Sequence, residues 1–251
     1  MDVAGISFMG KVGIITGAAQ GIGKAVAKQF VEMGGKAVIV DINPKTSAET
    51  CAELGNAVYY IADLSKADDI TRTFAQIISE QKKIDVLINC AGIVSTADFE
   101  KLTLDEWNRV LAVDLTAVFI TCQIMLKHMA ENGGGRIVNI SSVAAKVGGG
   151  YLGTAAYAAA KAGVICLTKS VAKAGSPKNV YCNSVCPSYT KTPMTQILTE
   201  EQAKAALGSI SLHRPAAPAE SAAPILFLAS DAASYIQGEN IICDGGLLMN
   251  G

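Results

Sequence analysis

Short apolar segments rich in β-formers alternate with helical segments along the whole chain of 251 residues, and no low-complexity linker interrupts them. Segments that are apolar throughout, such as Val86-Leu-Ile88, are typical of parallel strands covered by helices on both faces. We therefore expect one doubly wound α/β domain built on a seven-stranded parallel sheet, with strands at residues 12–16, 37–40, 57–61, 86–89, 136–141, 180–186 and 240–243. Helices are expected at residues 22–33, 66–81, 104–132, 155–174 and 219–228.

Composition excludes several classes of partner. The 21 basic and 22 acidic residues nearly cancel, and no basic run or acidic tail occurs, which argues against nucleic acid. The start of the sequence has an acid at position 2 and no long apolar block, so no signal peptide is predicted. We also expect no apolar stretch of the ~18 residues needed to cross a bilayer. The sequence thus predicts a soluble cytoplasmic protein without a membrane partner.

The seven cysteines are scattered and lie mostly in apolar runs. Cys182 and Cys186 fall on one predicted strand, where four steps separate their Cα atoms by ~13 Å, beyond the ~7 Å limit for a disulfide. Buried reduced thiols are therefore expected. Neither His128 nor His213 has an acidic or cysteine ligand beside it in sequence, so no metal site is predicted.

A glycine-rich loop, Thr16-Gly-Ala-Ala-Gln-Gly-Ile-Gly23, joins the first predicted strand to the first helix. Gly17 permits a tight turn, Gly21 lets the backbone approach a pyrophosphate at the helix N-terminus, and Gly23 lets helix and strand pack closely. The spacing differs from the usual G-x-G-x-x-G of dinucleotide sites. Its position between strand and helix nevertheless predicts a nucleotide site.

Asp41 closes the second predicted strand, 24 positions beyond the first glycine of that loop. An acid there can accept hydrogen bonds from ribose hydroxyls and would repel a 2′-phosphate. Gln20, Ile42 and Asn43 supply no cation to neutralise such a phosphate. The pattern favours NAD(H) over NADP(H). The alternative is that Asp41 is only a turn or helix-cap residue before Pro44.

Tyr157 and Lys161 are four residues apart in a run of helix formers, so a phenol and an ammonium group share one helical face. A phenol titrates near pH ~10, so its use at neutral pH requires a shift of about three units, or ~4 kcal/mol. An exposed ion pair seldom supplies that much. The pair is therefore either a tuned acid and base in a partly desolvated pocket or a surface tyrosine beside a solvated lysine.

Together these motifs closely resemble the short-chain dehydrogenase/reductase family over nearly the whole chain. Further segments carry the likeness: Asn89-Cys-Ala-Gly92, where the family usually has Asn-Asn-Ala-Gly, Ile137-Val-Asn-Ile-Ser-Ser142, Asn183-Ser-Val-Cys-Pro187, Lys191-Thr-Pro193, Phe227-Leu-Ala-Ser-Asp231 and Asp244-Gly-Gly246. The resemblance implies one Rossmann-fold domain over residues 1–251. Its cofactor half would cover about residues 1–145, and its catalytic and substrate half about residues 146–251.

The resemblance also implies a set of site residues. Catalysis would use Ser142, Tyr157, Lys161 and Asp114, and the substrate would meet Ser142, Tyr151, Tyr157, Tyr189 and Met194. Within the cofactor site, Asp63 would bind the adenine, Asn89 would hold the cofactor backbone region and Ile93 would flank the ribose. The expected cofactor contacts are Gly17, Gln20, Gly21, Ile22, Gly23, Asp41, Ile42, Asp63, Leu64, Asn89, Ala91, Gly92, Tyr157, Lys161, Pro187, Thr190 and Thr192.

Two positions depart from the family pattern. Asp114 stands where the family usually has an asparagine whose backbone carbonyl holds a relay water, and its carboxylate is expected to raise the pKa of Lys161. Ser142 and Tyr157 are 15 residues apart where 13 is common, with a glycine-rich loop at residues 148–153 between them. Ser141 remains an alternative for the acting hydroxyl.

The sequence therefore predicts an NAD(H)-dependent oxidoreductase that interconverts a secondary alcohol and a ketone, the substrate being a hydroxysteroid, a polyol or another secondary alcohol. A 3-oxoacyl-thioester reductase is an alternative, although its family members mostly prefer NADPH, which conflicts with Asp41. A nucleotide-binding regulatory protein without catalysis is a second alternative. A lid is expected at residues 188–212, and helices 104–132 and 155–174 are apolar enough to build a homodimer or homotetramer.

Overall fold

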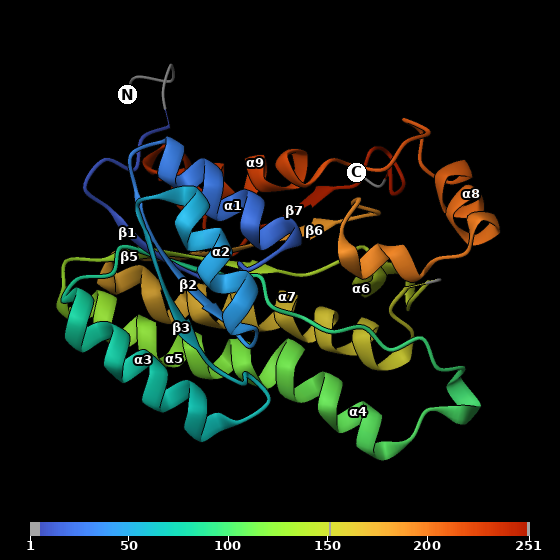
Figure 1. Ribbon diagram of the computed structural model, residues 1–251, viewed down its shortest axis with the longest axis horizontal. Helices are drawn as coiled ribbons and strands as arrows, with labels where there is room; N and C mark the ends of the chain where they lie inside the picture. The colour runs from blue at the N-terminus through green and yellow to red at the C-terminus, as the bar shows by residue number, and fades with distance from the viewer. Residues whose placement is uncertain (1–5, 151, 250–251) are drawn as a thin grey trace.

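Seven parallel strands form one sheet in the order β3-β2-β1-β4-β5-β6-β7 (Figure 1). The computed structural model describes residues 6–150 and 152–249. The strands are β1 (Val12–Thr16), β2 (Lys36–Asp41), β3 (Ala57–Ile61), β4 (Val86–Asn89), β5 (Gly135–Ile140), β6 (Val180–Pro187) and β7 (Asn240–Cys243). The predicted seven-stranded Rossmann-like sheet is confirmed, with boundaries that differ by at most one residue.

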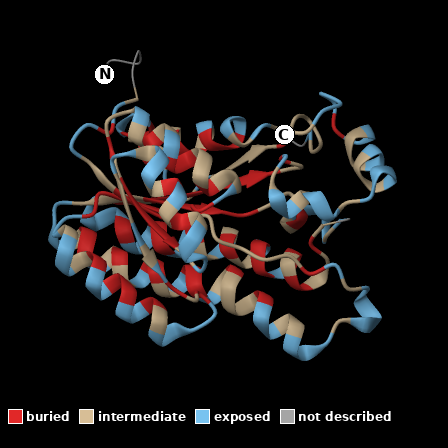
Figure 2. Ribbon diagram, viewed as in Figure 1, coloured by how far each residue is buried: buried red, intermediate tan, exposed pale blue. Residues whose placement is uncertain are grey.

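Helices cover both faces of this sheet (Figure 1). One face carries α1 (Gly21–Glu32), α2 (Pro44–Leu54) and α9 (Pro218–Ala229), and the other carries α3 (Ala67–Gln81), α5 (Ala117–Glu131) and α7 (Ala155–Gly175). Neighbouring strand residues point into opposite cores, because Ile14 packs with Phe74 while Ile15 packs with Phe30. Figure 2 shows the strands buried between the inner helix faces, which explains why they are apolar throughout.

The helix predicted at residues 104–132 is not a regular α-helix throughout. It consists of α4 (Leu104–Leu111), a π-helical turn η2 (Ala112–Thr116) and α5. Such turns widen a helix locally and are frequent at functional sites. Here the wider turn buries Asp114 completely.

Several short helices were not predicted: α2, α6 (Ala144–Val147), α8 (Glu200–Gly208), η1 (Phe99–Lys101), η3 (Ser176–Lys178), η4 (Pro193–Ile197) and η5 (Asp231–Ala233). The start of α2 has a recognisable cap, because the Asn43 side chain accepts hydrogen bonds from the backbone N–H groups of Lys45 and Thr46, and Pro44 takes the first helical position. Asn43, rather than Asp41, is therefore the cap before Pro44.

The expectation that no apolar segment reaches membrane-spanning length is wrong, because one helix is long enough and apolar enough to cross a bilayer. Within the described residues, the continuous helix Leu104–Glu131 meets both criteria, and 39% of its most apolar 18-residue window is buried inside the structure. Core helices that cover a sheet meet the same criteria. This one places Val118, Cys122 and Met125 in the core beneath the sheet.

The predicted strand position of Cys182 and Cys186 is confirmed, because both lie on β6 as buried free thiols. Cys122 is buried too, whereas Cys166 is exposed. The cysteines are thus free as expected, but they are not all in the core.

Candidate active site

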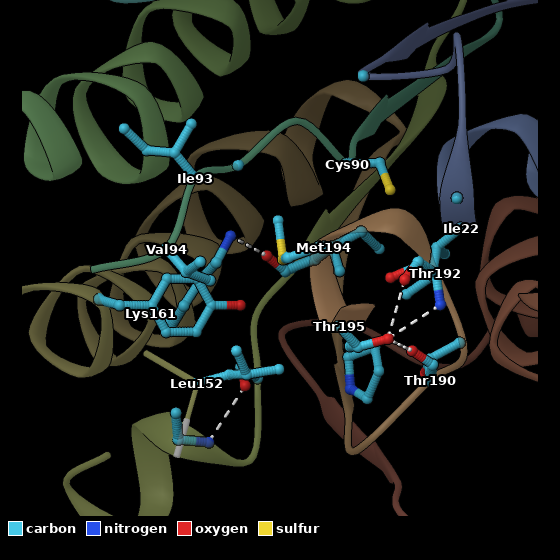
Figure 3. Close-up of a pocket in the computed structure, with 18 of the residues that line it drawn as sticks. Ile22, Cys90, Ile93, Val94, Leu152, Lys161, Thr190, Thr192, Met194 and Thr195 are labelled. Atoms are coloured by element: carbon cyan, nitrogen blue, oxygen red, sulfur yellow. Dashed lines mark hydrogen bonds between the residues drawn. The ribbon is translucent and has the colours of Figure 1, made fainter. Parts of the chain in front are cut away.

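A cavity of about 670 Å³ opens at the carboxyl ends of the strands, where doubly wound sheets bind ligands. The glycine loop, the ends of β2 and β4, helix α7 and the segment after β6 all contribute to its wall (Figure 3). Most of the predicted site residues line this one cavity: Gly17, Gln20, Gly21, Ile22, Gly23, Asp41, Ile42, Asp63, Leu64, Ala91, Gly92, Ile93, Ser142, Tyr157, Lys161, Pro187, Tyr189, Thr190, Thr192 and Met194. Tyr151 lies outside the described residues.

The glycine loop has no room for side chains at two positions. A Cβ atom on Gly17, whose φ is +66°, would lie 2.6 Å from the Ala91 Cα atom, and one on Gly23 would lie 2.3 Å from the Gly17 carbonyl oxygen. Gln20 precedes α1 and makes no side-chain cap, so the first N–H groups of the helix have no side-chain acceptor from it. These groups fit a pyrophosphate, whose negative charge the helix dipole would also stabilise.

Asp41 turns its carboxylate back onto the loops beside it. Its Oδ2 accepts a hydrogen bond from the Ala19 N–H group at 3.1 Å, and its Oδ1 accepts one from the Asn43 N–H group at 3.1 Å. The carboxylate keeps further acceptor sites on the cavity side, because each oxygen can accept two bonds. These contacts fit a ribose with free hydroxyls.

Asp63 and Asn89 have different surroundings. Asp63 lines the cavity, and hydrogen bonds from Ser65 and the nearby Lys66 ammonium lower the pKa of its carboxyl. Asn89 is buried below the cavity wall, where its Nδ2 donates to Asn139 Oδ1 at 2.8 Å and its Oδ1 accepts from the Thr121 hydroxyl at 2.8 Å. The Asn89 side chain therefore braces the sheet, and its contact with the cofactor stays a prediction.

Cys90 replaces the second asparagine of the family pattern and lines the same cavity (Figure 3). Burial raises the pKa of its thiol to about 12, although the nearby Lys161 ammonium opposes this. A thiol with such a pKa stays protonated at neutral pH and is a poor nucleophile. Cys90 is therefore part of the wall rather than a reacting group.

The structure separates the two candidate serines. The Ser141 hydroxyl is buried and donates a hydrogen bond to the Lys161 carbonyl oxygen at 2.7 Å, so it holds the backbone of α7. Ser142 is partly exposed to the cavity, and its Oγ accepts a bond from the Ala144 N–H group at 3.1 Å. The Ser142 hydroxyl proton thus remains available for a substrate oxygen, which favours Ser142.

Lys161 is held by two groups from other segments. Its Nζ atom lies 3.1 Å from Asp114 Oδ2 and donates a hydrogen bond to the Ile140 carbonyl oxygen at 3.0 Å. Both side chains of the ion pair are buried, and Asp114 Oδ1 also accepts from the Ile93 N–H group at 2.9 Å. A Cβ atom on Gly92 would lie 2.7 Å from Asp114 Oδ2, so the glycine makes space for the pair.

These contacts set the proton affinities of the site. Burial alone would lower the pKa of Lys161, but the Asp114 carboxylate and Tyr157 outweigh it, and the pKa is raised as predicted. Burial raises the pKa of Tyr157, the Lys161 ammonium lowers it, and Asp114 raises it again, so the protein's own groups leave it above its ordinary value. Lys161 is thus buried beside a partly buried Tyr157, but it does not by itself activate Tyr157, because Asp114 offsets part of its charge.

This balance predicts a pH effect of Asp114→Asn. A phenolate at Tyr157 would accept the alcohol proton, so kcat/KM for oxidation rises with pH as Tyr157 loses its own proton. Removing the Asp114 charge lowers the pKa of Tyr157, and the rise is expected to move to lower pH. The measurement is the pH profile of alcohol oxidation by both proteins. Asp63→Asn, which changes an acid elsewhere in the cavity, should leave the profile in place.

Taken together, the glycine loop, Asp41 and the Ser142, Tyr157 and Lys161 cluster define a dinucleotide-dependent oxidoreductase. Residues 17–248 match a family model described as enoyl-(acyl carrier protein) reductase. The chain therefore belongs to the short-chain dehydrogenase/reductase family, as the sequence motifs predicted, and is an enzyme of that family that uses a nicotinamide cofactor.

Individual relatives agree with this assignment. The chain is 36% identical to an acetoacetyl-CoA reductase of Acinetobacter sp. over 247 residues, covering 96% of this chain and 98% of the relative. It is 38% identical to a 3-oxoacyl-(acyl-carrier-protein) reductase FabG of Thermotoga maritima over 244 residues, covering 96% and 98%. The structure is similar to that of a short-chain type dehydrogenase/reductase from Mycobacterium marinum, with a TM-score of 0.93, 30% identity and coverage of 97% and 98%. A putative NAD(P)-dependent gluconate 5-dehydrogenase from Beutenbergia cavernae, solved with bound NADP, gives a TM-score of 0.90 at 33% identity, with coverage of 97% and 99%.

Sequence reasoning missed much of the remaining wall. Cavity-lining residues that it did not single out include Val94, Leu152, Leu198, Ile210, Leu247 and Leu248. Leu152 lies in the glycine-rich loop, and Leu247 and Leu248 follow the closing Asp244-Gly-Gly246 segment. Their positions beside these motifs were a weak indication that they line the site. Leu198 and Ile210 lie in the segment 188–212, where a lid is expected, and Val94 comes from a segment without a motif.

Proposed function

We propose that this enzyme interconverts a secondary alcohol and a ketone with NAD(H), using Tyr157 as the acid and base. The observation that supports this most is the meeting of Ser142, Tyr157 and Lys161 on one cavity wall that also holds the glycine loop and Asp41. The same intact cluster and the family membership argue against a regulatory protein without catalysis.

Each residue has a distinct part in the proposed reaction. Bound NAD+ would accept the hydride from the carbinol carbon. Tyr157 as phenolate takes the hydroxyl proton, and Ser142 donates a hydrogen bond to the substrate oxygen. Lys161 and the Asp114 that holds it keep a fixed positive charge beside the phenol ring, with Nζ 5.5 Å from the ring centre. In ketone reduction the proton and the hydride move the other way.

A panel of secondary alcohols and ketones, followed by NADH absorbance, tests this proposal. NADH binding with turnover of at least one class supports it, whereas binding without turnover of any compound contradicts it. The 3-oxoacyl-thioester reductase is retained as a second candidate because relatives 34–38% identical carry names of that kind. A 3-oxoacyl thioester of N-acetylcysteamine therefore belongs in the panel.

The preference for NAD(H) has its own test in Asp41→Ala. We expect the ratio of kcat/KM with NAD to that with NADP to fall about tenfold, equivalent to ~1.4 kcal/mol, because the variant loses ribose acceptors and a charge that repels a 2′-phosphate. Steady-state kinetics with both cofactors measure the ratio. Asp63→Ala should weaken both cofactors alike, and an unchanged ratio in Asp41→Ala would refute the assignment.

A homo-oligomer is proposed from the outer helices. Leu104 of α4 and Phe119 of α5 are exposed apolar residues of one continuous helical segment, as an uncovered subunit interface would show. Light scattering in solution measures the mass of the particle and so tests whether the protein is a homo-oligomer. The cytoplasmic location stays a prediction.

A further inference from the structure

The charged residues of the cavity are unevenly distributed. Among the described residues that line it, only Asp41, Asp63 and Lys161 carry charge. The two acids belong to the β2 and β3 ends, where the nucleotide is expected, and Lys161 lies at the end with Tyr157. The reacting end of the cavity therefore has one cation and no acid in its described wall.

That cation already has an anionic partner. Lys161 Nζ and Asp114 Oδ2 are 3.1 Å apart, and the exposed fractions of the two side chains are 4% and 0%. Lys146 and Lys191 neighbour cavity-lining residues in sequence, but both residues are exposed and neither lines the cavity. In the described wall, a negative substituent near the reacting carbon would meet no unpaired cation, because Asp114 offsets the attraction that Lys161 would otherwise provide.

Beyond the hydroxyl groups of Ser142 and Tyr157, much of this end is lined by apolar side chains. Figure 3 shows Val94, Leu152 and Met194, from three separate segments, on the same cavity as Lys161. Leu198, Ile210 and Leu248 also line the cavity. A carboxylate moved from water into such surroundings loses hydration that a few hydroxyl groups replace only in part and no unpaired cation of the described wall compensates.

We propose that the site accepts only substrates whose substituents close to the reacting carbon are uncharged, such as alkyl ketones, 3-oxo esters or 3-oxo thioesters, and that it rejects 3-oxo acids. This rests on the proposed function and narrows its substrate class. Family membership does not decide the point, since one solved relative is named for gluconate, which is a carboxylate.

The test compares methyl 3-oxohexanoate with 3-oxohexanoate, reduced with saturating NADH at pH 7, where the acid is ionised. We expect kcat/KM to be about 30-fold higher for the ester, because the carboxylate loses hydration that no unpaired cation of the described wall replaces. The amide 3-oxohexanamide matches the acid in shape without its charge, so it should be reduced faster than the acid. Equal kcat/KM values for ester and acid would overturn the proposal.

A matched pair of variants adds a second measurement. Met194→Lys places a cation on the apolar wall, and Met194→Gln changes the same position without charge. We expect the ester-to-acid ratio to fall in the lysine variant relative to the glutamine variant, and equal ratios in the two would contradict the electrostatic explanation. Failure of the proposed function would look different, because neither compound nor any other ketone of the panel would then be reduced.

Discussion

Tyr157→Phe is expected to lower kcat/KM by roughly 1,000- to 10,000-fold while the protein still folds and binds NADH. The substitution removes only the hydroxyl that would exchange a proton with the substrate, and a positioned acid or base contributes up to ~10⁴-fold. The ring stays in place because its surroundings, including Gly153, are matched to its shape. Single-turnover reduction of a panel ketone measures the loss.

NADH fluorescence provides the control for this variant. An unchanged NADH dissociation constant shows that the cofactor half of the cavity is intact and assigns the loss to chemistry. Ser142→Ala should lose less, about 100-fold, because it removes one hydrogen bond to the substrate oxygen but leaves the proton donor. Turnover by Tyr157→Phe near the level of the unchanged protein would refute the role of Tyr157.

Features that depend on short stretches of sequence could be predicted. The central strands were identified because each is buried on both faces and is therefore apolar without alternation, as Val86 to Ile88 illustrate. The glycine loop was identified because its spacing is a local pattern, and Gly23 has no room for a Cβ atom beside the Gly17 carbonyl oxygen of the same loop. Tyr157 and Lys161 were paired because four residues on a helix return to the same face.

Features that depend on contacts between distant segments could not be predicted from the sequence. The likeness to the family drew attention to Asp114, but only the fold shows that a π-helical turn directs its carboxylate onto Lys161. Asn89 is expected to hold the cofactor, but only the fold shows that the pairing of β4 with β5 places Asn139 beside its side-chain amide. The prediction of the apolar cavity wall was incomplete, because the residues that form it come from segments without a periodic pattern.

Gly153→Ala is expected to lower kcat by about 100-fold, although the residue carries no functional group. Its backbone has φ +79°, and an added Cβ atom would lie 2.1 Å from the Tyr157 Cδ1 atom, well inside contact distance. The ring or the loop must then move by more than an ångström, and a displacement of that size costs about 100-fold in turnover. Kinetics with a panel ketone and NADH fluorescence should show a lower kcat with an unchanged NADH dissociation constant.

Gly148→Ala is the matched control, because Gly148 has the same φ of +79° in the same loop but no atom within 4 Å of an added Cβ. Both variants carry the backbone penalty of a left-handed alanine, about 1 kcal/mol, and only Gly153→Ala touches the tyrosine. If the contact positions Tyr157, Gly148→Ala keeps most of its turnover. If the two variants lose turnover equally, the contact between residue 153 and the Tyr157 ring does not position the tyrosine. The longer loop before Tyr157 then affects catalysis only through its backbone conformation.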